Sequence, residues 1–238
     1  MLAMSDESAT ASPGKFSDLR TRLISAFAIA AIALFCIWQG GWWIVALACA
    51  ACGAMIVELW SMVTQAKPVL RGAKRVLSLG VAYIVLACVA FIWLRAQEPY
   101  GFLSILWAAC IVTAADVGGY FAGRVIGGPK LWPSVSPKKT WAGILGGVAL
   151  AFIVGGLFSW ATKGTFFIQV CLVSMIAAVV SQAGDLAESA LKRHFAVKDA
   201  SGLIPGHGGV LDRLDGHMAA ILVAAAFTAW RDQAVFIW

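Results

Sequence analysis

Asp185, Ser189 and Lys192 could bind a metal ion and a phosphate, and they are spaced as residues on one face of a helix are. Spacings of four and three residues place side chains on one face of a helix. A carboxylate and a hydroxyl are hard oxygen ligands that suit magnesium, and an ammonium group one turn further on can meet phosphate oxygens. The pattern predicts a metal site for phosphate chemistry. An ion pair between Glu188 and Lys192 is the structural alternative, but it leaves Asp185 and Ser189 without a role.

A glycine-rich turn and two further acids follow. Three glycines surround His207 between residues 205 and 209, so the backbone there can approach a ligand closely. Asp212 and Asp215 are spaced three residues apart and share one face at the start of the last apolar run. We expect Asp185 and Asp212, from neighbouring helices, to bind one divalent ion, whose charge keeps both carboxylates ionised. A solvated loop is the alternative.

A basic segment precedes this site in the chain, from Ser136 to Thr140. Serine followed by proline is typical of a helix start, which predicts Ser136 as the cap and Pro137 as the first helical residue. The free amides of a first helical turn favour an anion, and Lys138 and Lys139 add positive charge there. The segment suits a polyphosphate. An ordinary basic flank of a membrane span is the alternative.

Two more acids lie among apolar residues. Asp116 follows an almost wholly apolar run, and the glycines after it recur at GxxxG spacing, as do Gly143 and Gly147. Such spacing indicates close helix packing in a membrane, which explains the glycines and leaves Asp116 as a candidate substrate contact. For Glu58 we expect a structural role near a helix end, pairing with Lys67 or extending its carboxylate toward water.

Composition indicates where these groups are held. Hydrophobic residues make up 61% of the 238 positions, charged residues 13%, and the mean hydropathy is +0.85, outside the range of soluble domains. A spanning helix needs roughly 20 apolar residues. The chain is therefore expected to be an all-α polytopic membrane protein with about seven spans, at residues 23–38, 42–60, 76–94, 102–122, 141–160, 166–182 and 217–230.

The distribution of positive charge predicts the orientation of these spans. If the N-terminus is cytoplasmic, 15 of the 18 lysines and arginines fall in cytoplasmic segments, as expected for an inner-membrane protein. The active site then lies on the cytoplasmic face. The net charge of +6 is explained by this topology and by attraction to anionic lipid or substrate, so no nucleic-acid partner is expected. Residues 1–14 are expected to form a disordered tail, and not a cleaved signal.

In their order, these segments resemble the phosphatidate cytidylyltransferase (CDP-diacylglycerol synthase) family. That family's signature has the form S-x-apolar-K-R, four residues, K-D, then P-x-H-G-G-apolar-x-D-R-apolar-D. The matching segments here are Ser189–Arg193, Lys198–Asp199, Pro205–Gly209 and Leu211–Asp215. The run from Asp116 to Gly147 is similar to a second block of the family, so the resemblance covers about the C-terminal half of the chain.

The resemblance implies a magnesium-dependent reaction of CTP with phosphatidate that gives CDP-diacylglycerol and pyrophosphate. It implies a metal centre at Asp185, Ser189 and Asp212, with a possible second cation such as K⁺. His207 would contact a phosphate or the departing pyrophosphate, although an ordered turn histidine is the alternative. The catalytic residues implied are Asp185, Asp212, Asp215, Lys192 and His207. The phosphate-binding set is Lys192 with Ser136, Lys138, Lys139, Thr140, Arg193, Lys198 and Arg213. A homodimer is also implied.

The chain divides on this basis into a tail at 1–14, N-terminal membrane helices at 15–100 and a catalytic membrane region at 101–238. Two other functions remain open. A CTP-dependent polyprenol kinase would also need clustered acids and lysines, but it leaves the long signature match unexplained. An ion-coupled transporter would place its acids at mid-membrane, whereas these acids accompany basic clusters at the ends of predicted spans.

Overall fold

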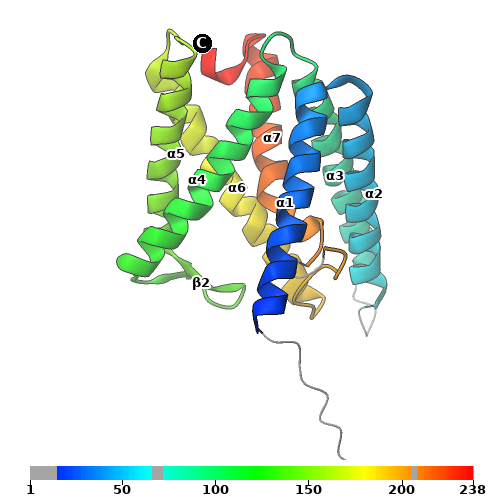
Figure 1. Cartoon of the computed structure of the whole chain (residues 1–238). Coiled ribbons are helices and arrows are strands. Elements are labelled where there is room, and N and C mark those ends of the chain that lie inside the picture. The colour runs from blue at the N-terminus through cyan, green and yellow to red at the C-terminus, as the bar shows by residue number, and fades with distance from the viewer. Residues whose placement is uncertain (1–14, 66–71, 205–207, 238) are drawn as a thin grey trace, which may run out of the picture.

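A computed structural model describes the chain at residues 15–65, 72–204 and 208–237 (Figure 1). The predicted tail at 1–14, Lys67 and His207 lie outside the described residues. The helices within them are α1 (Lys15–Gln39), α2 (Gly41–Gln65), α3 (Ala73–Arg95), α4 (Gly101–Val125), α5 (Trp141–Ala161), α6 (Phe167–His194) and α7 (Leu211–Arg231). A two-stranded hairpin, β1 (Lys130–Trp132) and β2 (Ser136–Thr140), joins α4 to α5.

Each predicted span corresponds to one helix of the bundle. Five helices, α2 to α6, are long and apolar enough to cross a membrane, as judged within the described residues. The chain is therefore a multi-pass helical membrane protein. Helix α6 is 28 residues long and continues well past the predicted end of its apolar run at residue 182. This extension carries Asp185 to Lys192, as the sequence predicted.

Successive helices run in opposite directions, so every second connection lies at the same end of the bundle (Figure 1). The β hairpin, the last turns of α6 and the first turn of α7 lie together at the lower end in this view, where α1 also begins. The C-terminal end of the chain lies at the opposite end. Segments far apart in the sequence therefore meet at one face of the bundle.

Glycines let α4 and α5 pack closely, which confirms the expected helix contact. A Cβ atom at Gly118 would lie 2.5 Å from the carbonyl oxygen of Gly146, and one at Gly143 would lie 2.9 Å from that of Gly119. Such distances leave no room for a side chain, so the two backbones touch directly. The hairpin that connects these helices is consequently anchored at both of its ends.

The predicted helix start at Ser136 is wrong. Ser136 lies in β2, where it pairs with Trp132, and the helix begins five residues later at Trp141. Pro137 lies within this short strand, and a two-stranded ribbon tolerates a proline because one side of each strand needs no partner. The cap of α5 is Thr140, whose hydroxyl accepts a hydrogen bond from the Gly143 amide at 3.1 Å.

This cap gives a first prediction. Thr140→Ala is expected to lower stability by about 1 kcal/mol, because it leaves a buried helix amide without an acceptor. Thr140 is itself buried, so water cannot replace the hydroxyl. The measurement is the temperature at which detergent-solubilised protein loses its monodisperse peak. Thr140→Ser keeps the hydroxyl and should remain near the wild-type value, and equal losses in both variants would contradict the capping role.

Candidate active site

Three elements meet at Lys139, whose ammonium group lies between two polar side chains of α6. Its Nζ is 2.6 Å from Asp185 Oδ2 and donates to Gln182 Oε1 at 2.8 Å. The Gln182 amide in turn donates to Asp116 Oδ1, on α4, at 2.9 Å. The hairpin, α6 and α4 are therefore joined by one polar chain. The sequence predicted Lys139, Asp185 and Asp116 as site residues, and the structure brings all three together through Gln182.

Three carboxyl groups form a compact acidic cluster next to this chain. Oxygens of Asp185, Glu188 and Asp215 all lie within 4.8 Å of one another. Burial, followed by the nearby Asp185 carboxylate, raises the pKa of Asp215 to about 7. Carboxylates gathered this closely repel one another unless positive charge is supplied. The cluster offers the carboxylate oxygens that a hard divalent cation prefers.

Lys192 lies between two further buried contacts. Its Nζ is 2.7 Å from Glu188 Oε2 and 2.9 Å from Asp212 Oδ1, which confirms the i, i+4 ion pair weighed as the structural alternative. The contact of Glu188 with Lys192 is an ion pair through Oε2, and neither Glu188 oxygen accepts a further hydrogen bond from the described residues. Glu188 therefore keeps oxygen lone pairs available beside Asp185 and Asp215.

Asp212 holds the connection between α6 and α7. Its carboxylate accepts hydrogen bonds from the amides of Ala200 at 3.0 Å and Gly209 at 2.8 Å, besides the bond from Lys192. Burial acts to raise the pKa of Asp212, but these donors outweigh it and lower the pKa below its usual value. The predicted pairing of Asp212 with Asp185 on one metal ion would require Asp212 to release some of these donors.

Glu58 has the structural role that the sequence predicted, but its carboxylate is buried in the protein. Glu58 is only 3% exposed, and its carboxylate accepts hydrogen bonds from Ser201 Oγ at 2.6 Å, Val210 N at 2.9 Å and Leu211 N at 2.8 Å. It therefore does not extend toward water. It links α2 to the start of α7, which the sequence alone did not indicate.

The other predicted residues lie at the same end of the bundle. Ser189 Oγ is 3.4 Å from Asp185 Oδ1, so it remains beside the acidic cluster. Ser136 is half-buried in β2. Four predicted phosphate-binding cations are exposed at this end, namely Lys138, Arg193, Lys198 and Arg213. Exposed cations of this kind can meet an anionic ligand that arrives from water.

Sequence reasoning missed Gln182 and assigned Glu188 only to an ion pair. For Glu58 it predicted a structural role near a helix end, but not the contact with the start of α7. One signal was available for Gln182, which is a polar residue within an apolar run and three residues before Asp185. Glu58 carried the same signal, an acid inside a predicted span. Neither residue belongs to a local motif, because their partners are distant in the sequence.

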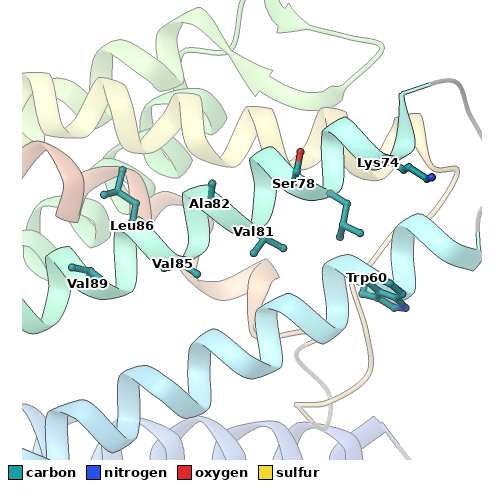
Figure 2. A pocket seen from close by; sticks show the side chains of 9 residues that line it. Trp60, Lys74, Ser78, Val81, Ala82, Val85, Leu86 and Val89 are labelled. Atoms are coloured by element: carbon teal, nitrogen blue, oxygen red, sulfur yellow. The ribbon is translucent and has the colours of Figure 1, made fainter.

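A large groove of about 810 Å³ lies apart from these polar contacts, along α2 and α3 (Figure 2). Its lining is apolar except for Lys74 and Ser78 near one end, where Trp60 also lies. Residues such as Val81, Leu86 and Val89 suit hydrocarbon, and none of the predicted site residues lines the groove. The groove is therefore not the place of the polar chemistry.

The fold is that of a multi-pass helical membrane protein with acids and lysines clustered at one end of the bundle. Comparison with known proteins gives the particular class. The sequence model of the cytidylyltransferase family matches residues 71–230, and the chain belongs to this family. It is accordingly a nucleotidyltransferase.

Curated relatives from several bacteria bear the name phosphatidate cytidylyltransferase. The protein of Brucella suis is 35% identical over 257 residues, which cover 90% of this chain and 94% of the relative. That of Bacillus subtilis is 38% identical over 143 residues, covering 60% of this chain and 53% of the relative. That of Haemophilus influenzae is 42% identical over 131 residues, covering 52% and 46%.

Proposed function

We propose that this chain transfers CMP from CTP to phosphatidate, giving CDP-diacylglycerol and pyrophosphate for phospholipid synthesis. In this reaction an oxygen of the lipid phosphate bonds to the α-phosphorus of CTP, and the bond from that phosphorus to the bridging oxygen of pyrophosphate breaks. The observation that carries the proposal is the contact between Lys139 and Asp185. It unites the basic hairpin with the helix that bears the family signature.

The chemistry asks mainly for alignment and charge neutralisation. The lipid phosphate is already a competent nucleophile, so no covalent intermediate with the protein is needed. Lys139 and Lys192 lie at the acidic cluster and are placed to contact phosphate oxygens of CTP. The exposed cations at the same end, Lys138, Arg193, Lys198 and Arg213, would guide and hold the anionic substrates. His207 is proposed as a phosphate donor.

The acidic cluster fits a magnesium ion. The carboxyl groups of Asp185, Glu188 and Asp215 gather beside Lys139 and Lys192, and a divalent cation among them would favour the ionised form of all three. We propose that Asp185, Glu188 and Asp215 hold the ion, with Ser189 beside them. Asp212 joins them if it gives up its present donors. A bound Mg²⁺ would offset the charge on the transferring phosphoryl group. K⁺ is proposed as a second cation.

We also propose a placement in the cell and an assembly. The described helices alternate in direction, and an inner-membrane orientation with the site in the cytoplasm puts most positive charge inside. Helix α1 and the apolar part of α7 from His217 onward would complete seven spans. This orientation lets the site take CTP from the cytoplasm and phosphatidate from the bilayer. The assembly proposed from family resemblance is a homodimer.

The test uses purified full-length protein in detergent micelles that contain phosphatidate. With Mg²⁺ and CTP labelled at the α-phosphate, label is expected to enter a CDP-lipid and unlabelled pyrophosphate is expected to appear. A chelator should stop both, and added Mg²⁺ should restore them. Phosphorylated polyprenol with release of CDP would instead indicate a lipid kinase. Ion-driven solute uptake into liposomes without CDP-lipid would indicate a transporter.

A further inference from the structure

We infer that Glu58, which lies outside the segment matched by the family model, is a positioning residue for the active site. This inference rests on the proposed function. Helix α7 has no side-chain cap of its own, since Val210 at its N-terminus makes no such hydrogen bond. The carboxylate of Glu58 supplies the cap from α2, because it accepts from the Val210 and Leu211 amides. A negative charge at this end of a helix is stabilising.

Glu58 and Asp212 hold the connection between α6 and α7 at adjacent positions. Asp212 accepts from the amides of Ala200 and Gly209, while Glu58 accepts from the neighbouring Ser201 and Val210. The two carboxylates thus bind the segment that leaves α6, at residues 200–201, and the segment that enters α7, at residues 209–211. Fixing these segments sets where α7 begins relative to α6.

The consequence reaches the acidic cluster directly. Asp212 and Asp215 follow Leu211 within the first turn and a half of α7, so their positions depend on where that helix starts. Lys192 and Asp185 belong to α6. A shift of the α7 start would change the distance from Asp212 to Lys192 and from Asp215 to Asp185. Displacements of about 1 Å at a reacting centre lower rates on the order of 100-fold.

Packing around the carboxylate shows that its place is tightly defined. A Cβ atom at Gly209 would lie 2.7 Å from Glu58 Oε1, so only glycine fits there without displacing the carboxylate. Glu58 itself is buried, and water cannot take over its three hydrogen bonds. Gly209→Ala should therefore reproduce the effect of changing Glu58. At Gly202, in the same connection, a Cβ atom would meet nothing within 4 Å.

The experiment compares Glu58→Gln, Glu58→Asp and Gly209→Ala in the full-length protein. Glutamine has a single acceptor oxygen and places an NH₂ group against amide donors, so kcat/KM for CTP should fall at least about tenfold per folded molecule. Aspartate restores the charge and should recover part of the loss. Hydrogen exchange at the Val210 and Leu211 amides should become faster in Glu58→Gln. Glu98→Gln, an exposed carboxylate elsewhere, and Gly202→Ala are controls expected to match wild type.

Two results would overturn the inference. One is a wild-type kcat/KM per folded molecule in Glu58→Gln, and the other is unchanged exchange at Val210 and Leu211. If Glu58→Gln does not fold, Ser201→Ala removes one of the three donors and should give a smaller loss of the same kind. Failure of the wild-type protein to form CDP-lipid would reject the proposed function, while the exchange measurement would still decide whether Glu58 holds the start of α7.

Discussion

Asp185→Asn is expected to lower CDP-diacylglycerol formation by at least about 100-fold while the protein still folds and inserts. Asp185 is the residue shared by the ion pair with Lys139 and by the acidic cluster with Glu188 and Asp215. The amide removes a negative charge that both contacts use. It keeps nearly the same shape, and the side chain is partly exposed, so the cost in stability should be small.

The measurement is the initial rate with labelled CTP over a range of Mg²⁺ concentrations. Asp232→Asn is a matched control, because Asp232 is exposed just after α7 at the opposite end of the bundle. Asparagine also tolerates the left-handed backbone found there. An Asp185→Asn protein with near wild-type rates at saturating Mg²⁺ would remove Asp185 from the catalytic set. Normal rates at low Mg²⁺ would remove it from the metal ligands as well.

Lys192→Met is expected to have the largest effect on stability, of about 3 to 5 kcal/mol, because it strips the shared counter-charge from two buried carboxylates. The side chains of Glu188 and Asp212 are 7% and 6% exposed. Asp212 would also lose the donor that fixes it to α6, so activity per folded molecule should fall at least about 100-fold. Heating detergent-solubilised protein and following the monodisperse fraction measures the first effect, and CDP-lipid formation measures the second.

A second substitution shows whether the stability loss of Lys192→Met comes from charge or from packing. Glu188→Gln combined with Lys192→Met removes one buried charge of each sign, so the double variant should be more stable than Lys192→Met alone. Lys74→Met changes an exposed lysine of α3 and should leave stability near wild type. If the double variant is as unstable as the single one, the loss comes from packing of the lysine stem and not from uncompensated charge.

Much of this architecture could be predicted because hydropathy and charge act locally along the chain. Each of the seven apolar segments became a helix, and the extension of α6 beyond residue 182 follows from polar residues at helical spacing. The cluster of Asp185 with Lys139 was also anticipated in part. Both residues lie at the ends of spans that the positive-charge rule places on the same side.

The failures share a different physical cause. The start of α5 was misplaced because Ser136 and Pro137 satisfy the local rules for a cap, while pairing with β1 is a contact between strands. Gln182, and the contacts that Glu58 makes with the start of α7, were overlooked because the partners lie far away in the sequence. The hydrogen bonds that Asp212 accepts from the amides of Ala200 and Gly209 were likewise not foreseen, while its place beside a metal ion stays a prediction. Tertiary contacts of this kind have no signature in a single segment.

The position of Lys139 in the β hairpin bears on how much side-chain entropy it would lose on binding a nucleotide phosphate. Lys139 directly precedes Thr140, which caps α5, and α5 is locked by glycine contacts against α4. Its ammonium group is already held by Gln182 and Asp185. If an anion replaced Asp185 as its partner, the lysine would therefore lose little rotamer entropy. Preorganisation of this kind would lower the entropy cost of binding a nucleotide phosphate at the hairpin.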